Sequence, residues 1–323
     1  MTKIDIISGF LGAGKTTLIQ KLLKEALNGQ KVVLIENEFG EIGIDGGFLK
    51  ESGVQITEMN SGCICCSLVG DFGTALKDVL NTYTPDRVII EPSGVGKLSD
   101  VIKAVEDVAK EIEVELNSYT AVVDASKCKM YMKNFGEFFN NQVEHANTII
   151  LSRTQNMKED KLEASVALLR EHNEKAKIVT TPWDDISGDK ILETMEVSKS
   201  LADEMMEEHH HHHHEDGHCC GHDHHHHHHH ADDVFTSWGV ETPHKYEKEK
   251  VEEALKKLAN TEEFGIILRA KGMIAGVDGS WIYFDLVPGE YELREGSPEY
   301  TGRLCVIGTK LEEEKLKELF EIS

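Results

Sequence analysis

A glycine-rich loop followed by a lysine and a threonine constrains the fold of this chain more than any other feature. The sequence Gly9-Phe-Leu-Gly-Ala-Gly-Lys-Thr16 fits the pattern GxxxxGK[ST]. It follows a β-rich run at residues 3–8 and precedes an amphipathic helical pattern at residues 15–27, which is the context that the pattern requires. Glycines let successive backbone N–H groups surround phosphate oxygens, and the positive end of the helix dipole adds to the attraction. The loop therefore predicts a site for a nucleoside triphosphate.

Each side chain of this loop has an expected role. Lys15 should reach the β- and γ-phosphates, the Thr16 hydroxyl should bind Mg²⁺, and Thr17 should lie next to the α-phosphate. The remaining phosphate contacts are expected from the backbone of four small residues, which are Gly9, Gly12, Ala13 and Gly14.

A glutamate and a glycine follow a third buried run, residues 87–90. Because the carboxyl ends of parallel strands lie where phosphates bind, Glu91 is expected to orient Mg²⁺ or the attacking water. The N–H group of Gly94 can approach the γ-phosphate. We therefore assign Lys15 and Glu91 as the candidate catalytic residues.

The alternation of strand and helix patterns predicts an α/β fold, with a parallel sheet covered by helices on both faces. The predicted strands are residues 3–8, 31–35, 87–90, 121–123, 148–151 and 177–180. The expected organisation is a nucleotide-binding domain at 1–200, a histidine-rich linker at 201–233 and a small α+β domain at 234–323. The last domain is predicted from helical patterns at 245–259 and 312–320 and from strand patterns at 265–270, 281–286 and 303–308.

The charge and hydropathy of the chain exclude several classes of protein. With 58 acidic and 34 basic side chains, the formal charge of −24 disfavours binding to nucleic acid or to an anionic membrane surface. No apolar run approaches the ~18 residues that a membrane-spanning helix needs. The first residues lack the pattern of a secretory signal, so we expect a cytoplasmic protein.

Three cysteines within four residues form a candidate metal motif, Cys63, Cys65 and Cys66. Thiolates favour Zn²⁺ or Cu⁺ over Mg²⁺, and a fourth ligand would come from elsewhere. Buried structural thiols and a redox pair are the alternatives. Glu36 and Glu41, in an acidic loop before this motif, are candidate metal-binding carboxylates, although a solvated loop would also contain such charges.

A low-complexity segment holds 15 of the 18 histidines. Imidazole suits divalent transition metals, so we expect several loosely bound ions instead of one defined site. The candidate ligands of this tract are His209, His210, His211, His212, His213, His214, His218, Cys219, Cys220, His222, His224, His225, His226, His227, His228, His229 and His230. A solvated polar linker is the simpler alternative.

Four segments in this order, SGFLGAGKTT, IENEFGEIGID, NSGCICCS and EPSG, resemble the CobW family of P-loop GTPases, relatives of the HypB and UreG metallochaperones. RAKGM at residues 269–273, Trp281 and RLCVIG at residues 303–308 are similar to the C-terminal domain of that family. The resemblance therefore covers almost the whole chain. It implies a P-loop GTPase that uses GTP and Mg²⁺ and handles Zn²⁺ or Co²⁺.

The resemblance also implies roles for particular residues. Cys63, Cys65 and Cys66 would form the metal motif, and Lys15, Thr16 and Glu91 would lie in the nucleotide site. The partner would be a client metalloprotein or a metal-cofactor enzyme, and a nucleotide-dependent homo-oligomer is left open. A histidine-rich metal buffer that nucleotide regulates is the alternative function.

The chain departs from the family of GTPases at the guanine-reading motif NKxD. At that place it has Ser152, Arg153, Thr154 and Gln155. An aspartate accepts two hydrogen bonds from guanine, whereas the Gln155 amide offers one acceptor and one donor. Ser152, Arg153 and Gln155 are the candidate base-site residues, with Arg153 able to stack on the base. GTP is the expected nucleotide, and ATP is the alternative.

Overall fold

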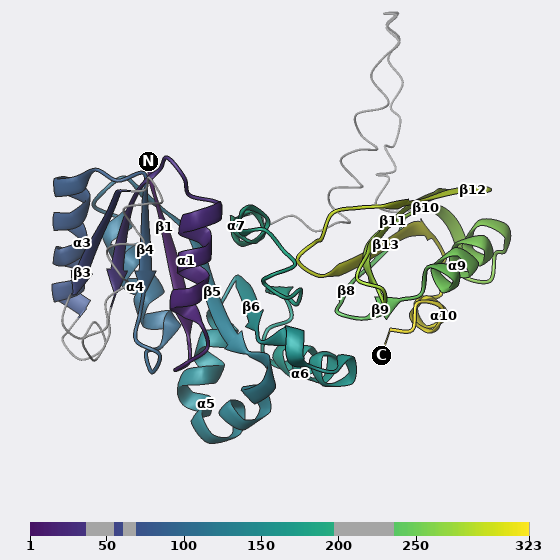
Figure 1. The fold of residues 1–323 in the computed structure, drawn as a ribbon, viewed down its shortest axis with the longest axis horizontal. Helices are drawn as coiled ribbons and strands as arrows, with labels where there is room; N and C mark the ends of the chain where they lie inside the picture. Colours follow the sequence, from purple (N-terminus) through teal and green to yellow (C-terminus); the bar gives the residue numbers. More distant parts are fainter. Residues whose placement is uncertain (37–54, 61–68, 197–235, 323) are drawn as a thin grey trace, which may run out of the picture. The chain divides into compact units, whose positions relative to one another are not determined.

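The computed structural model describes residues 1–36, 55–60, 69–196 and 236–322. The chain divides into two compact units, Met1–Val197 and Ser198–Ser323 (Figure 1). None of the helices in the described residues is both long enough and apolar enough to cross a membrane.

The first unit is built on a parallel sheet with strand order β3-β2-β4-β1-β5-β6-β7. The central strand β1 pairs with β4 on one side and with β5 on the other. The strands are β1 (Thr2–Gly9), β2 (Lys31–Glu36), β3 (Gln55–Asn60), β4 (Arg87–Glu91), β5 (Val114–Asp124), β6 (Thr148–Ser152) and β7 (Lys177–Val179). Because all of them run in the same direction, their carboxyl ends meet at one edge of the sheet.

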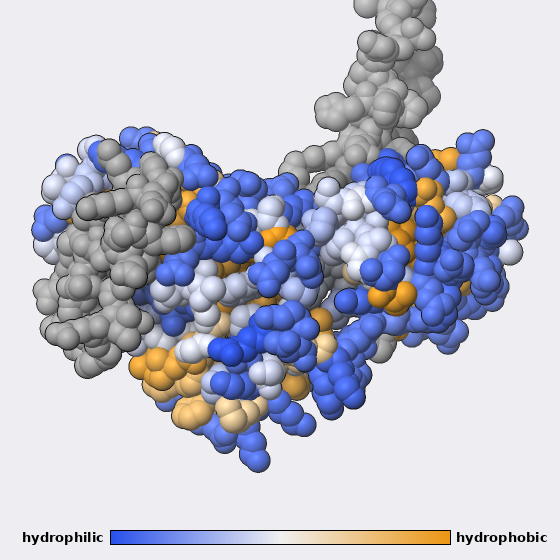
Figure 2. All heavy atoms as spheres, in the orientation of Figure 1, coloured by the Kyte–Doolittle hydropathy of each residue, from blue (hydrophilic) through white to orange (hydrophobic). Residues whose placement is uncertain are grey.

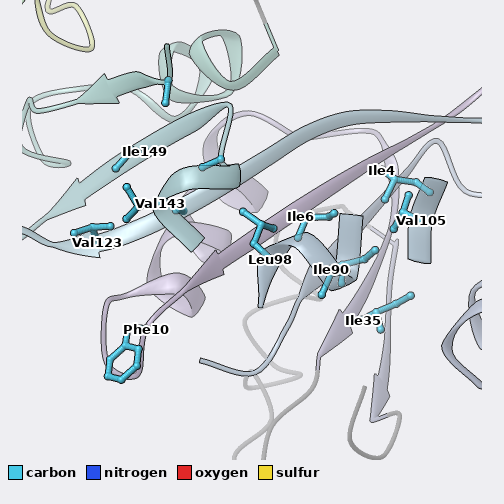
Figure 3. Close-up of a cluster of buried hydrophobic side chains, with 14 of the residues drawn as sticks. Ile4, Ile6, Phe10, Ile35, Ile90, Leu98, Val105, Val123, Val143 and Ile149 are labelled. Atoms are coloured by element: carbon cyan, nitrogen blue, oxygen red, sulfur yellow. The ribbon is translucent and has the colours of Figure 1, made fainter. Parts of the chain in front are cut away.

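Helices cover both faces of this sheet, as the sequence predicts. Helices α3, α4, α5 and α6 contact one another in series on one face, and α1 contacts α7 on the other (Figure 1). Their bounds are α1 (Lys15–Glu25), α3 (Val69–Tyr83), α4 (Leu98–Ala109), α5 (Cys128–His145), α6 (Glu159–His172) and α7 (Gly188–Glu196). Figure 3 shows part of the core on the first face, where Ile6, Ile90 and Leu98 lie together.

The predicted α/β fold is confirmed, but one strand and half of another were missed. β3 lies at the end of the strand order, and its sequence QITEMN mixes polar and apolar residues. A strand at the edge of a sheet does not need the continuous apolar run that marks a strand buried on both faces. β5 begins at Val114, seven residues before the predicted start, because its first half carries Glu115 and Asn117.

The second unit contains a six-stranded sheet of order β12-β11-β10-β13-β8, with the short β9 paired to β10. All pairs are antiparallel except β9 with β10. The strands are β8 (Thr236–Thr242), β9 (Lys245–Tyr246), β10 (Ile266–Gly276), β11 (Trp281–Val287), β12 (Glu290–Glu295) and β13 (Gly302–Thr309), and the helices are α9 (Lys248–Asn260) and α10 (Glu313–Leu319). The small α+β fold is thus confirmed, whereas β8, β9 and β12 were not predicted.

A buried ion cluster fastens α7 to the amino ends of the central strands. The Arg87 side chain, only 4% exposed, pairs with Asp5 of β1 and lies 2.6 Å from the Glu196 carboxylate at the end of α7. Asp5 also accepts hydrogen bonds from Asn117 at 2.7 Å and from Ser118 at 2.6 Å. Burial opposes the charge of Glu196, but the hydrogen bond and charge of Arg87 outweigh it and hold the pKa of Glu196 below its ordinary value.

The Arg87→Ala variant should be less stable than the wild type by about 3–5 kcal/mol at neutral pH, because Asp5 would remain buried without its cation. The difference in the free energy of unfolding between the variant and the wild type should become smaller in acid. The pKa of Glu196 is lowered in the folded state, so its contribution is complete above the unfolded pKa and is lost as the pH falls through the folded value. Urea unfolding at several pH values measures both effects. Lys110→Ala, which breaks the exposed pair with Asp107, is the control and should leave stability unchanged.

Candidate nucleotide site

The glycine-rich loop connects β1 to α1 at the centre of the sheet. A Cβ atom on Gly9 would lie 2.4 Å from the Val122 carbonyl oxygen, so only glycine lets β1 pass so close to β5 at this point. Gly14 has a φ of 104° in the left-handed region and caps α1, which begins at Lys15. Gly12 and Ala13 complete the loop, and the Ala13 N–H donates to the Phe10 carbonyl at 3.1 Å. The loop thus presents the N-terminus of α1 at the carboxyl edge of the sheet.

Lys15, Thr16 and Glu91 meet at the head of α1. The Thr16 hydroxyl lies 3.2 and 3.3 Å from the two carboxylate oxygens of Glu91. The Lys15 ammonium lies 3.8 Å from the same carboxylate, and the two side chains are 10% and 4% exposed. A carboxylate and a hydroxyl are hard oxygen ligands, so this pair fits the chemistry of Mg²⁺. Thr17 follows on the exposed side of the helix.

The loop that follows Glu91 runs directly against the glycine-rich loop. A Cβ atom on Gly94 would lie 2.9 Å from the Leu11 nitrogen, so glycine is needed for this close approach. The buried amide of Gln142 in α5 donates to the Gly94 carbonyl at 3.2 Å and to the Gly96 carbonyl at 2.9 Å. Sequence reasoning missed Gln142, because a single amide within a helix carries no sequence signal.

The candidate base-site residues separate in the structure. Ser152, at the end of β6, is buried, and its hydroxyl donates to the Val123 carbonyl at 3.4 Å. Arg153 has a φ of 63°; one of its terminal nitrogens donates to the Gly12 carbonyl at 3.0 Å, and its Nε lies 3.0 Å from the Asp124 carboxylate. Gln155 is exposed in the short helix η2 (Thr154–Asn156). Arg153 therefore joins the phosphate loop to the end of β5.

Two further residues at this edge were not predicted. Asp124 is 1% exposed, ends β5 and accepts hydrogen bonds from the backbone and hydroxyl of Ser126 at 3.0 and 2.6 Å. Its place at a strand end was the available signal. Trp183 follows β7, and its indole N–H donates to the Leu151 carbonyl at 2.9 Å. Only the fold reveals that this ring lies beside Gly14.

The predicted transition-metal ligands lie almost entirely outside the described residues. This holds for Cys63, Cys65, Cys66, Glu41 and the whole tract from His209 to His230. The backbone of Glu36 is described: it ends β2, in register with Asn60 of β3 and with Glu91 of β4. The chain therefore leaves β2 and β3 at the edge that holds Glu91, and Cys63 follows Asn60 by three residues.

Two cysteines among the described residues are poorly suited to bind a metal. Cys128 in α5 and Cys305 in β13 are buried, and burial raises the pKa of each thiol to about 12. A metal binds the thiolate, so thiols that stay protonated at neutral pH are poor ligands. Both pack in hydrophobic clusters and serve the cores of their units.

A parallel sheet with a strand, a phosphate loop and a helix at its centre defines the fold of P-loop NTPases. The model of the CobW/HypB/UreG nucleotide-binding domain matches residues 3–180, and the model of the cobalamin synthesis protein cobW C-terminal domain matches residues 235–322. The chain belongs to the CobW/HypB/UreG family.

Several known proteins are similar to this chain. The zinc chaperone YjiA of Escherichia coli strain K12 is 33% identical over 192 residues, 57% of this chain and 58% of that protein. The zinc chaperone CobW of a Sinorhizobium species is 40% identical over 128 residues, 38% of this chain and 36% of that protein. The matched part of the chain thus spans between 36% and 58% of the length of these relatives. The crystal structure of Zn(II)-bound YjiA GTPase from E. coli covers 99% of this chain, which covers 98% of that one, with 23% identity and a TM-score of 0.44.

Proposed function

We propose that this protein is a nucleotide-dependent metallochaperone that hydrolyses GTP to deliver or insert zinc or cobalt into a client metalloprotein or metal-cofactor enzyme. The observation that carries the proposal is the meeting of Lys15, Thr16 and Glu91 at the head of α1. Membership of the family and the names of the similar zinc chaperones support the metal part.

Hydrolysis joins a water oxygen to the γ-phosphorus and breaks the bond to the β–γ bridging oxygen, giving GDP and inorganic phosphate. In this proposal the Lys15 ammonium binds the β- and γ-phosphate oxygens and stabilises the charge that develops there. Thr16 and Glu91 would hold Mg²⁺, whose charge neutralises the same oxygens. Glu91 then orients either that ion or the attacking water, and Gln142 fixes the loop that brings Gly94 to the γ-phosphate.

The cargo site is proposed to be the motif of Cys63, Cys65 and Cys66, with carboxylates from Glu36 or Glu41. Strand register supports a connection to the nucleotide. Glu36 precedes the acidic loop and lies in backbone register with Glu91 of the neighbouring strand β4. Asn60 precedes the cysteines and lies in backbone register with Glu36. A triphosphate that draws Lys15 away from Glu91 would therefore change the charge next to both of these strand ends. Thiolate ligands require reduced cysteines, which a cytoplasmic location would provide.

The division of labour along the chain is likewise a proposal. The part at 1–200 binds nucleotide and cargo, the linker at 201–233 collects loosely bound ions through its histidines, and the part at 234–323 contacts the client. Neither nucleic acid nor a membrane is proposed as a partner, whereas a nucleotide-dependent homo-oligomer is left open. The histidine tract favours one other function, a metal buffer that nucleotide only regulates. Use of ATP by the same fold is the alternative that Gln155 suggests.

Zinc affinity should depend on which nucleotide is bound. We expect at least about a fivefold difference between the protein with a non-hydrolysable GTP analogue and the protein with GDP, because coupling between sites is commonly of this size or larger. Competition with a chromophoric chelator measures the zinc affinity in each state. Zinc should change the affinity for the GTP analogue by the same factor. Equal zinc affinities in both states would favour the buffer over the metallochaperone.

A further inference from the structure

Trp183 lies where three parts of the nucleotide site meet. One edge of its ring is 3.3 Å from the position that a Cβ atom on Gly14 would take, and that position is 3.9 Å from the Ser152 Cβ. The indole N–H donates to the Leu151 carbonyl at 2.9 Å, so the ring is held at the end of β6. The Trp183 side chain is half-buried. In the sequence it follows the buried Thr180 and Thr181 and precedes the exposed Asp184.

The order of the strands fixes which side of the loop the nucleoside takes. Glu91 ends β4, on one side of β1, and the terminal phosphate with its Mg²⁺ belongs to that side. The sugar and base must then extend the other way, over the ends of β5, β6 and β7. Trp183 follows the last of these strands and contacts the head of α1, so its ring lies along that path.

The bonds that Arg153 and Trp183 already make limit what each side chain can offer to a base. Arg153, which the sequence suggested for stacking, is tied to the Gly12 carbonyl and to the Asp124 carboxylate. The single donor of Trp183 is used by the Leu151 carbonyl, and an indole has no acceptor. The ring can therefore attract a base through its face but cannot read the donors and acceptors on the base edge.

We propose that Trp183 is the platform on which the nucleotide base stacks, and that it makes binding tolerant of guanine and adenine alike. This inference rests on the proposed nucleotide site and adds the residue that sets its selectivity. Every base has a π face, so stacking strengthens the binding of GTP and of ATP together. Selectivity for GTP is then left to the weak reader Gln155 and should be small.

The Trp183→Ala variant should bind both GTP and ATP about ten- to a hundredfold more weakly, because base stacking on an aromatic ring is commonly of this size. It should bind inorganic tripolyphosphate, which has no base, as the wild type does. Trp183→Phe should keep most of the affinity for the nucleotides. The matched control is Trp238→Phe, in the second unit, which should change none of the three affinities. Competition against a fluorescent nucleotide measures all of them in Mg²⁺.

The outcomes separate the platform from the site on which it rests. Unchanged nucleotide affinity in Trp183→Ala, or an equal loss for tripolyphosphate, would overturn the platform while leaving the phosphate loop in place. A loss for GTP alone would overturn the tolerance of both purines. Failure of the wild type to bind tripolyphosphate and nucleotide at all would instead contradict the proposed function.

Fluorescence gives a second readout, since Trp183 is the one tryptophan of the described part of the first unit, and the other two, Trp238 and Trp281, belong to the second. The difference between the spectra of the wild type and Trp183→Phe isolates its emission. We expect saturating GTP or ATP to change that emission and tripolyphosphate to leave it nearly unchanged. An equal response to all three would contradict stacking.

Discussion

Replacing Lys15 with alanine should reduce the rate of GTP hydrolysis at saturating nucleotide by about a hundred- to a thousandfold. Losses of this size follow the removal of one group that stabilises developing charge in a transition state. Lys15 is suited to that role because it is 10% exposed, at the head of α1, and has Glu91 as a nearby counter-charge at 3.8 Å. Phosphate release in Mg²⁺ and GTP measures the rate.

The matched control for this variant is Lys24→Ala, which removes an exposed lysine from the last turn of the same helix. It should hydrolyse GTP at the wild-type rate. Removing Lys15 also takes a cation from the buried Glu91, so the thermal unfolding of both variants should be compared with that of the wild type. A Lys15→Ala protein that is folded and hydrolyses GTP at the wild-type rate would contradict a catalytic role for the phosphate loop.

Changing Cys63, Cys65 and Cys66 together to serine should weaken the tightest zinc site by about a thousandfold or more. Sites with thiolate ligands reach binding free energies of about 10–16 kcal/mol, and three lost thiolates remove most of this. Deleting residues 209–230 should instead lower the number of bound ions while leaving one tight site and the basal hydrolysis rate. Zinc titration with a competing chelator measures both affinity and stoichiometry.

Cys128→Ala is the thiol control for this experiment. Cys128 is buried in α5 with its pKa raised to about 12, so its loss should not alter zinc binding. If deletion of the histidine tract eliminates the tight site and the triple serine variant keeps it, the cysteine motif is not the cargo site and the buffer function is favoured.

The parts of the fold that the sequence predicted are those governed by local patterns. Continuous apolar runs identified the central strands, since burial on both faces demands them. The glycine-rich loop could be predicted because its backbone conformation and its close contacts require glycine at positions such as Gly9 and Gly14. β3 and the first half of β5 escaped prediction, because at the sheet edge or next to polar partners a strand tolerates residues such as Glu58 and Asn117.

The contents of the candidate site were predictable only in part, for a related reason. Lys15, Thr16 and Glu91 lie at strand and helix ends that the topology brings together, so their meeting follows from the order of the strands. Gln142 and Trp183 reach the site from elements far along the chain and depend on how α5 and the loop after β7 pack. Arg153 follows β6, which the sequence predicted as a strand, but its contacts with Asp124 and Gly12 required the neighbouring strand end to be known.

The burial of Cys128 and Cys305 limits the number of thiols that can react with a reagent while the protein is folded. Both thiols are enclosed and protonated at neutral pH, whereas alkylating and disulfide reagents attack thiolates. At most five of the seven cysteines can therefore titrate before the cores open. The number of thiols that added zinc protects can then be compared with this maximum of five for the folded protein. Reaction of the two further thiols in denaturant would show that both units have unfolded completely.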